Sequence, residues 1–519
     1  MKKTLIVCCI FSVFILHADG EKQAAVKTDS LRQKSASGEG RGGSGMDQGR
    51  VLTEPGIWFP MVEPTRISAG SVSKSDTRGL LPLPCQTITK QDAAHSSLAW
   101  SGLNLPLPAD RVLHVPIYLD DFQAGGYSPS LSIQLTNAGG EIRYSFSANS
   151  FKAAGWSFIP LWDPSTPADA VFSKIGTSWI VEEKGFDFTK PVRSISIVPD
   201  NLPAGAKISI ASIETAAKTK PVIVVTVDIC DDSTFQYIVP IMEAAGFRGG
   251  LRIGGSKERS YSEDRMAKLR KAYDNGWDVY NGSWSRCGFN DASTPELLER
   301  EILECRKRAE VLGFTRGMTW FSAAGNVLPS QSVCRTVGSR LGMKAFKDGG
   351  GIGRVNIIRS DGVDDPAILT CTGMGGSWIR PASGVCGEST IAMPNVRSLR
   401  EGSAVSGTGI GVGARIAPHG VHGNTVVLTV RNTDDIAGPV TLSDSLEVHM
   451  AFADGLLFTG GALVYFMHDV RKSSEPPTSL SFPVEDFTRL VAYWKAKSDL
   501  GLLDVVTPSR FDAIMRSEH

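Results

Sequence analysis

Two stretches of this chain are hydrophobic almost without polar interruption. Residues 221–227 read PVIVVTV, and residues 463–467 read LVYFM. Runs of β-branched and aromatic residues without alternation are typical of parallel strands that are covered on both faces. The first run is followed by Asp228 and the second by His468 and Asp469. Because the reactive groups of α/β folds lie at the carboxyl ends of the strands, we expect the acid and the imidazole to meet at one site.

Around these runs, hydrophobic residues recur at helical spacing. The clearest helix opens at Thr294 and Pro295 and ends at Gly313. Its hydrophobic stripe consists of Leu298, Ile302, Cys305, Ala309 and Leu312. Further helices are predicted over residues 235–245, after Ser262 and over 485–497, with short strands at 251–253, 277–280 and 505–506. Helices that alternate with strands in this way predict an α/β fold, either a barrel or an open doubly wound sheet.

The preceding part of the chain alternates between hydrophobic and polar residues in short runs. Between residues 103 and 216 these runs are separated by turn sequences such as Asn-Ala-Gly-Gly and Pro-Asp-Asn. This pattern predicts a β-sandwich over residues 56–217, which in outline resembles the jelly-roll carbohydrate-binding modules of secreted glycan enzymes. Its tryptophans either stack on sugar rings or belong to the core. They are Trp100, Trp156, Trp162 and Trp179.

The N-terminus has the features of a targeting segment. Lys2 and Lys3 precede an apolar stretch over residues 5–16, and small residues follow at 18–20. We therefore predict a signal peptide over residues 1–20 and a secreted or periplasmic protein. The stretch is shorter than the roughly 20 residues of a membrane span, so no stable membrane anchor is expected. Residues 21–55 are rich in Gly, Ser, Lys and Gln, which predicts a flexible linker.

Composition narrows the possible partners. The 519 residues include 54 Lys plus Arg and 54 Asp plus Glu, so the overall charge does not favour nucleic acid as a partner. Seven of the nine cysteines follow the predicted signal peptide, and export would allow disulfides. Cys371 and Cys386, which flank a loop rich in Gly and Ser, are the predicted local pair.

Three segments together resemble the polysaccharide deacetylase family, also called carbohydrate esterase family four. They are residues 224–253 (beginning VVTVDICDD), 266–286 (ending DVYNGSWSR) and 461–470 (GALVYFMHDV). The resemblance implies an irregular (β/α) barrel of the deacetylase type over residues 218–519. Residues 344–457 exceed what one barrel step requires, and we expect them to form an inserted lobe over the barrel mouth.

The resemblance also implies a chemistry. In this family a divalent metal, commonly zinc, is held by one Asp and two His and polarises both the attacking water and the acetyl carbonyl. Asp228 matches the residue that accepts the proton of the water, and His468 matches the acid that protonates the leaving group. Ile229 falls at the position of the ligating Asp. Asp231 or Asp232 would supply that ligand if the loop changed its register.

The chain departs from the family at the two His ligands, which correspond here to Gly282 and Arg286. Glycine offers no side-chain ligand, and a guanidinium does not lose its proton to bind a cation. His419 and His422, three residues apart, are another candidate pair, but no nearby carboxylate in the sequence completes a ligand set. The sequence therefore does not support a divalent metal in the usual position of the family.

The predicted function is that of a secreted, deacetylase-like hydrolase that cleaves amide or ester bonds of acetylated glycans. We expect Arg286, Trp284 and Asp469 to contact the polysaccharide. Two alternatives remain open. One is a catalytically inactive protein on the same fold, in which Arg286 binds an anionic sugar. The other is a metal-independent, glycan-cleaving enzyme that uses Asp228 together with a second carboxylate. The candidates for that second carboxylate are Asp231, Asp232 and Asp469.

Overall fold

The structure is a computed structural model. It describes residues 52–53, 56–60, 66–68, 71–75, 85–89, 97–108, 111–120, 129–147, 155–161, 179–199, 207–210, 212–217, 220–228, 230–254, 261–290, 292–351, 356, 358–359, 367–375, 377–393, 402–422, 424–472, 475 and 481–515. The predicted signal peptide and nearly all of the predicted linker lie outside the described residues.

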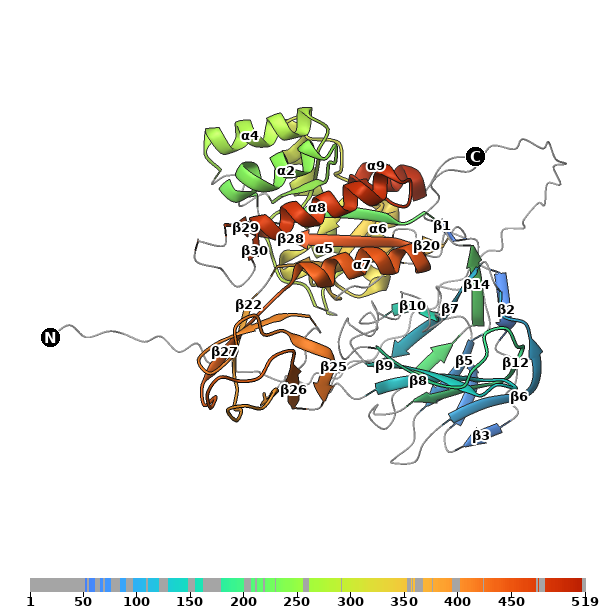
Figure 1. The fold of residues 1–519 in the computed structure, drawn as a ribbon. Helices are drawn as coiled ribbons and strands as arrows, with labels where there is room; N and C mark the ends of the chain where they lie inside the picture. The colour runs from blue at the N-terminus through green and yellow to red at the C-terminus, as the bar shows by residue number, and fades with distance from the viewer. Residues whose placement is uncertain are drawn as a thin grey trace, which may run out of the picture. The chain divides into compact units, whose positions relative to one another are not determined.

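The C-terminal part is built around one parallel sheet, in which the strands lie in the order β16-β17-β18-β19-β21-β28-β15-β31. The strands are β15 (Val222–Val227), β16 (Gly250–Ile253), β17 (Asp278–Asn281), β18 (Trp320–Ser322), β19 (Ala345–Gly351), β21 (Ala367–Met374), β28 (Ala462–Met467) and β31 (Asp504–Val506). Strand β15 pairs with β28 on one edge, and with both β31 and β16 on the other. The sheet is therefore a nearly closed parallel barrel (Figure 1). The two hydrophobic runs predict its buried parallel strands, and of the two arrangements left open by the sequence pattern the structure has the barrel.

Helices follow most of these strands. They are α2 (Val239–Ala244), α4 (Glu263–Asp274), α5 (Pro295–Val311), α6 (Gln331–Leu341), α7 (Leu446–Thr459), α8 (Val484–Asp499) and α9 (Pro508–Met515). The predicted helix starts at Ser262 and Thr294 are confirmed, because each side chain accepts a hydrogen bond from a backbone N–H three residues later. The first predicted helix is different. It begins as a π-helical segment, η2 (Thr234–Ile238), and becomes α-helical only at Val239.

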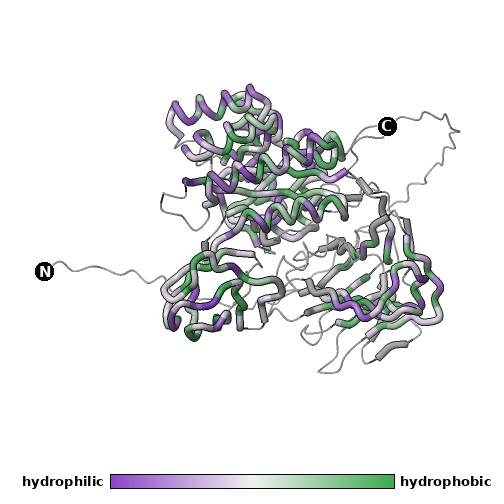
Figure 2. The backbone as a smooth tube through the Cα atoms, viewed as in Figure 1, coloured by the Kyte–Doolittle hydropathy of each residue, from purple (hydrophilic) through white to green (hydrophobic). Residues whose placement is uncertain are grey.

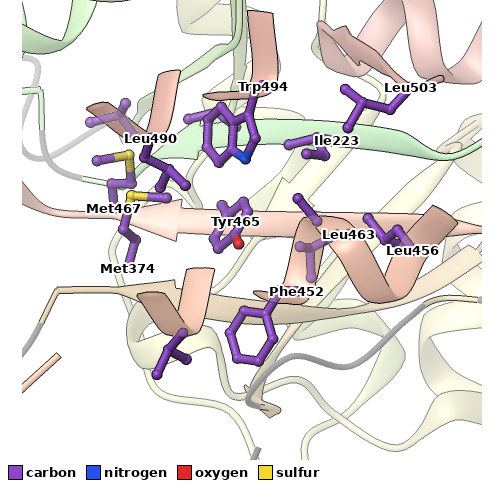
Figure 3. Close-up of a cluster of buried hydrophobic side chains, with 14 of the residues drawn as sticks. Ile223, Met374, Phe452, Leu456, Leu463, Tyr465, Met467, Leu490, Trp494 and Leu503 are labelled. Atoms are coloured by element: carbon purple, nitrogen blue, oxygen red, sulfur yellow. The ribbon is translucent and has the colours of Figure 1, made fainter. Parts of the chain in front are cut away.

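Side chains of the barrel strands alternate between the interior and the helices. Val222 and Val224 belong to an interior cluster with residues of several other barrel strands, whereas Ile223 and Val225 belong to a cluster that includes helix residues. Figure 3 shows side chains of β28 between those of α7, such as Phe452, and those of α8. Both faces of β15 and β28 are therefore covered, which explains the two hydrophobic runs without alternation and the hydrophobic colour of these strands in Figure 2.

The interior is apolar toward the amino ends of the strands. Trp320 lies there edge-on to Phe511 of helix α9, with 5.5 Å between the ring centroids. On the same interior face, Val224 is followed by Thr226 near the end of β15, and Asp228 comes directly after the strand. The interior therefore becomes polar toward the carboxyl ends, where the candidate site lies.

Two small antiparallel sheets lie between β21 and α7 in the chain. One joins β22 (Ser377–Pro381), β27 (Pro439–Ser443) and β24 (Ala404–Ser406). The other joins β23 (Thr390–Ala392), β26 (Thr425–Leu428) and β25 (Ile416–His422). The predicted bounds of the inserted lobe, 344–457, include residues of the barrel, because β19 and β21 are strands of the barrel sheet. Residues 346–351 (FKDGGG) have a loop-like composition, but β19 pairs with both β18 and β21.

The N-terminal part contains two antiparallel sheets. The larger one contains β2 (Gly56–Pro60), β14 (Ser212–Ala217), β7 (Arg111–Asp120), β13 (Lys207–Ile210), β5 (Cys85–Thr89), β4 (Ser71–Ser75) and β10 (Gly155–Leu161). The smaller one contains β11 (Trp179–Lys184), β9 (Glu141–Ser147), β8 (Pro129–Thr136), β12 (Val192–Pro199), β6 (Ser97–Leu105) and β3 (Arg66–Ser68). Their packing as a β-sandwich stays a prediction.

Of the four tryptophans considered above, Trp100 is a core residue. It is buried and lies edge-on to Phe59, with 5.6 Å between the ring centroids. It is therefore not available to stack on a sugar. The side chains of the other three lie outside the described residues.

The predicted disulfide between Cys371 and Cys386 is wrong, because both are free thiols. Cys371 is buried inside the barrel on β21, whereas Cys386 is exposed beyond β22. The flanking glycines suggested a short loop between the two, but that segment contains a strand of the inserted sheets. Among the helices that the structure describes, none has the length and apolar character of a membrane span.

Candidate functional site

Asp228 and His468 are brought together by the pairing of β15 with β28. Val227 lies beside Met467 in that pair, and the Asp228 N–H donates to the Met467 carbonyl over 2.8 Å. Asp228 and His468 are the next residues on the two strands, and both continue the interior face. The ring of His468 lies edge-on to that of Phe466, with 5.7 Å between the centroids. The two residues selected from the sequence thus occupy neighbouring positions at the barrel mouth.

The Asp228 carboxylate is buried and accepts three side-chain hydrogen bonds. Its Oδ1 accepts from Lys347 Nζ and from the Tyr280 hydroxyl, each over 2.5 Å. Its Oδ2 accepts from Asn326 Nδ2 over 3.0 Å. Lys347 is itself fully buried and also donates to the Tyr280 oxygen over 3.0 Å. The carboxylate is therefore the centre of a fixed polar network.

These contacts decide the ionisation of Asp228. Burial alone would favour the neutral acid, but the charges of Lys347 and Arg252, with the hydrogen bonds of Lys347 and Tyr280, outweigh it. The pKa of Asp228 is therefore held well below its usual value. A carboxylate with such a low pKa is a weak proton acceptor.

Sequence reasoning missed Lys347 and Asn326. Lys347 lies on β19, within a glycine-rich stretch that resembles a loop. Asn326 follows β18 in a short turn, where it has a φ of 54°. The Ser322 hydroxyl donates to Asn326 Oδ1 over 2.7 Å, which leaves the amide Nδ2 to donate to Asp228. No local pattern marks either residue as part of this site.

His468 is half-buried and its pKa is lowered. Burial is the largest cause, and the neighbouring charges of Lys347 and Arg252 act in the same direction. The negative charge of Asp228 acts in the opposite direction without reversing the shift. A histidine with a pKa below its usual value is a neutral imidazole at neutral pH, so it is able to accept a proton.

The side chain of Arg252 occupies the space beside Gly282, the position of the family's first His ligand. A Cβ atom on Gly282 would lie 2.5 Å from Arg252 Nε, 2.6 Å from its Cγ and 2.6 Å from the Ile253 carbonyl oxygen. Arg252 Nη2 also donates to the Gly282 carbonyl over 3.2 Å. A larger residue is therefore excluded at 282, and a guanidinium lies where the resemblance implies a metal ligand.

The loop that carries Gly282 and Arg286 is held by Glu301 of helix α5. The buried Glu301 carboxylate accepts from the Ser283 hydroxyl over 2.6 Å, and from the N–H and the hydroxyl of Ser285 over 2.7 and 2.8 Å. Ser283 and Arg286 both have positive φ, 70° and 57°. Such backbone conformations persist only where the surroundings enforce them, which Glu301 does here.

Arg286 and Trp284, predicted to contact substrate, differ in their surroundings. Arg286 is half-buried, and its pKa is lowered by burial and by the nearby charge of Arg252. Trp284 packs partly against the hydrophobic core, and its backbone N–H donates to the backbone carbonyl of Glu301 over 3.1 Å. Arg286 therefore belongs to the charged part of the site, whereas Trp284 mainly supports the loop.

The three remaining candidate carboxylates have other partners. Asp231 accepts from the Ser233 hydroxyl over 2.7 Å and from the Thr234 N–H over 3.2 Å, at the start of η2. Asp232 is exposed and pairs with Arg265 over 3.3 Å. Asp469 accepts from Arg471 Nε over 2.6 Å.

The side chains around Asp228 do not fit the divalent metal that the resemblance implies. Among the described residues, no three His, Cys, Asp or Glu side chains are grouped to hold a metal. Gly282 and Arg286 stand at the two His positions, and the charges that act on Asp228 are those of Lys347 and Arg252. A cation would be repelled by these groups, so a metal is not part of the chemistry proposed below.

Comparisons with known proteins give structural similarities only. No family model matches the chain, and no curated protein matches its sequence. A family 4 acetyl xylan esterase from Clostridium thermocellum, solved with a cobalt ion, is 14% identical with a TM-score of 0.20, over 25% of this chain and 58% of that one. The chain thus spans less than two thirds of that esterase.

Two further solved structures are similar over more of their length. The Xyl-CE4 domain of a xylanase from the hindgut metagenome of Trinervitermes trinervoides is 9% identical, with a TM-score of 0.28 over 56% of this chain and 88% of the domain. A family 4 carbohydrate esterase from Streptomyces lividans, solved with acetate, is 10% identical, with a TM-score of 0.26 over 55% and 91%. Similarities of this size assign neither a family nor an activity to the chain.

Proposed function

We propose that this chain is a glycan-active hydrolase that removes acyl groups, such as acetyl, from a polysaccharide without a metal. The observation that supports this proposal is the position of Asp228 and His468, on paired strands at the carboxyl end of a parallel barrel. A neutral imidazole beside a fixed carboxylate is a suitable acid–base group for acyl transfer. The cations Lys347 and Arg252 act on the same residues and favour negative charge.

The proposed reaction follows from the ionisation of these groups. Neutral His468 takes a proton from water as the water oxygen attacks the acyl carbonyl carbon. The carbonyl electrons move to the oxygen, where the nearby positive charge stabilises the oxyanion. The intermediate then collapses, the bond to the sugar oxygen or nitrogen breaks, and the imidazolium protonates that leaving atom. The products are a carboxylic acid and the deacylated glycan.

Asp228 has a supporting part in this scheme. The sequence suggested that it accepts the proton of the water, but three hydrogen bonds and a low pKa make it a weak acceptor. We therefore propose that its charge stabilises the His468 imidazolium and holds Lys347 and Tyr280 in place. The electrostatic effect of Asp228 on the pKa of His468 has the required sign.

The experiment measures acetate released from acetylated xylan and from N-acetylglucosamine oligomers, after treatment of the protein with a chelator. We expect chelation to leave the rate unchanged and His468→Gln to lower kcat by about 100-fold or more. Asp232→Asn, which changes an exposed carboxylate that pairs with Arg265, is the matched control and should keep the activity. Activity should fall as pH drops through the lowered pKa of His468, since the base must be neutral.

Two results would contradict the scheme. One is loss of activity with the chelator and its recovery with zinc, which would show a metal enzyme. The other is release of reducing ends in place of acetate, which would favour a glycan-cleaving enzyme.

A second candidate function is a glycan-binding protein without catalysis. The observation that favours it is the complete engagement of the Asp228 carboxylate by Lys347, Tyr280 and Asn326. Retained glycan binding without acetate or reducing-end release would select this function.

The wider setting of either function is also a proposal. The predicted signal peptide supports action outside the cytoplasm, and the antiparallel sheets of residues 56–217 support an appended glycan-binding sandwich.

A further inference from the structure

Positive charge exceeds negative charge around the candidate site. The charges of Lys347, Arg252 and Arg286 lie close enough to affect one another or Asp228, which is the buried carboxylate that acts on both Arg286 and His468. A second carboxylate, Asp469, also acts on His468, but it is engaged by Arg471. Lys347 forms the close ion pair with Asp228. The charge of Arg252 instead lowers the pKa of Arg286, because the two guanidinium groups repel each other. The arrangement is therefore electrostatically incomplete without an anion.

Of the two arginines, Arg252 gives the stronger indication of a ligand, because it is the more deeply buried. It is only 6% exposed, yet its described hydrogen bond is to the Gly282 carbonyl, a neutral acceptor. The ion pairs formed by the described residues include none for Arg252 or Arg286. The charge of Arg252 acts on Asp228 from beyond ion-pair distance, and Lys347 holds that carboxylate directly. Buried guanidinium groups normally form a direct ion pair, because a buried charge without one is costly. A cation kept in this way at a barrel mouth indicates that its partner is a ligand.

We propose that Arg252 and Arg286 bind a negatively charged substituent of the glycan, either the carboxylate of a uronic acid or a sulfate ester. The planar guanidinium group matches both groups, because its parallel N–H donors reach two oxygens at once. Lys347 is already engaged by Asp228, so the two arginines provide the anion site. The inference rests on the proposed function, in that the bound glycan is the one whose acyl group lies near His468.

Glu301 has a positioning part in this site. Its carboxylate holds Ser283 and Ser285 and so fixes the backbone of the loop that ends at Arg286, where φ is 57°. A free loop would let Arg286 turn away from the repulsive charge of Arg252. Two like charges held together in this way provide a preorganised anion site.

The experiment is calorimetric titration of the full chain with three trisaccharides of equal length. One is built of uronic acids, one of the corresponding neutral sugars, and one of sulfated sugars. We expect the two charged probes to bind at least about tenfold more tightly than the neutral one, since hydrogen bonds to charged groups have that strength. Raising the salt from about 0.05 M to about 0.5 M should reduce this difference. The stronger of the two charged probes identifies the source of the anion.

Arg286→Gln tests the assignment, because the side chain is half-buried and its replacement preserves the loop backbone. It should weaken binding of the charged probes about tenfold and leave the neutral probe unchanged. Arg489→Gln, which removes a 68% exposed guanidinium from helix α8, is the matched control and should change neither. Equal affinity for all three probes, or equal effects of the two variants, would overturn the inference.

The inference and the proposed function fail in different ways. Acetate release from a neutral acetylated glycan that depends on His468, without any preference for charged probes, would keep the hydrolase and overturn the anion site. Binding of charged probes that depends on Arg286, without any acetate release, would keep the anion site and overturn the hydrolase.

Discussion

Replacing Lys347 with methionine tests the most tightly coupled contact in the barrel. The Lys347 side chain is 0% exposed and that of Asp228 is 2% exposed, and their charged atoms lie 2.5 Å apart. Methionine has a similar length, so the variant removes the positive charge while nearly preserving the packing. It leaves a buried carboxylate with the hydrogen bonds of Tyr280 and Asn326 but without its closest counter-charge.

The magnitude follows from the cost of an unpaired buried charge. Removal of one partner of a buried ion pair typically lowers the free energy of unfolding by about 3–5 kcal/mol. Exposed pairs contribute about 0–1 kcal/mol, so Lys268→Met is the matched control. Lys268 is 44% exposed on helix α4, where it pairs with Asp264. The double variant Asp228→Asn with Lys347→Met should be more stable than Lys347→Met alone, since neither charge then remains.

The effect should depend on pH. In the native protein the pKa of Asp228 is below its unfolded value, so its stabilising contribution is present above that unfolded value and is lost as pH falls through the folded pKa. Without Lys347, burial dominates and raises the pKa of Asp228. Protonation of Asp228 at lower pH then removes the unpaired charge and stabilises the variant. The stability difference between the two proteins should therefore shrink between about pH 7 and about pH 4.

Urea unfolding, followed by tryptophan fluorescence at both pH values, measures this difference. A loss for Lys347→Met no larger than that for Lys268→Met would refute the assignment of Lys347 as the counter-charge of Asp228. A loss that is large but independent of pH would show that packing, and not charge, is responsible.

The remaining predictions concern steric fit and thiol chemistry. Gly282→Ala should lower the free energy of unfolding by about 1–3 kcal/mol, because the new Cβ would overlap Arg252, whereas Gly288→Ala should have little effect, since no atom lies within 4 Å of its added Cβ. A zinc titration of Gly282→His should show no gain of a metal site. Cys386 should react with a thiol reagent in the native protein and Cys371 only after unfolding, because Cys386 is exposed while burial raises the pKa of Cys371 to about 12.

Two findings would contradict these predictions. One is a Gly282→Ala variant as stable as Gly288→Ala, which would show that Arg252 moves aside freely. The other is a peptide linking Cys371 to Cys386 in a non-reducing digest, which would restore the predicted disulfide.

Much of the barrel could be predicted from local pattern. The run over residues 222–227 and its counterpart over 462–467 are strands because both of their faces are covered, a condition that is visible in composition. The starts of α4 and α5 were predicted because Ser262 and Thr294 cap their own helices, which is a local interaction. The predicted lobe boundary failed because β19 contains glycines and is held as a strand by its neighbours.

The chemistry of the mouth required contacts between distant positions. Asp228 and Lys347 are 119 positions apart, and Asp228 and Asn326 are 98 apart. A strand pattern reports that a residue faces the interior, but not which residues of other strands face it there. That depends on the register of every pair around the barrel and on its near closure.

The sequence alone was thus enough to place an acid and an imidazole at the ends of two buried strands. It also showed that the two histidines implied by the resemblance are missing. It was not enough to show what stands in their place. The space beside Gly282 is filled by Arg252 of the neighbouring strand, and the charge of Asp228 is balanced by Lys347 from β19. These contacts arise only when the strands close into a barrel, because closure brings side chains of distant strands together and removes the water that would otherwise solvate their charges.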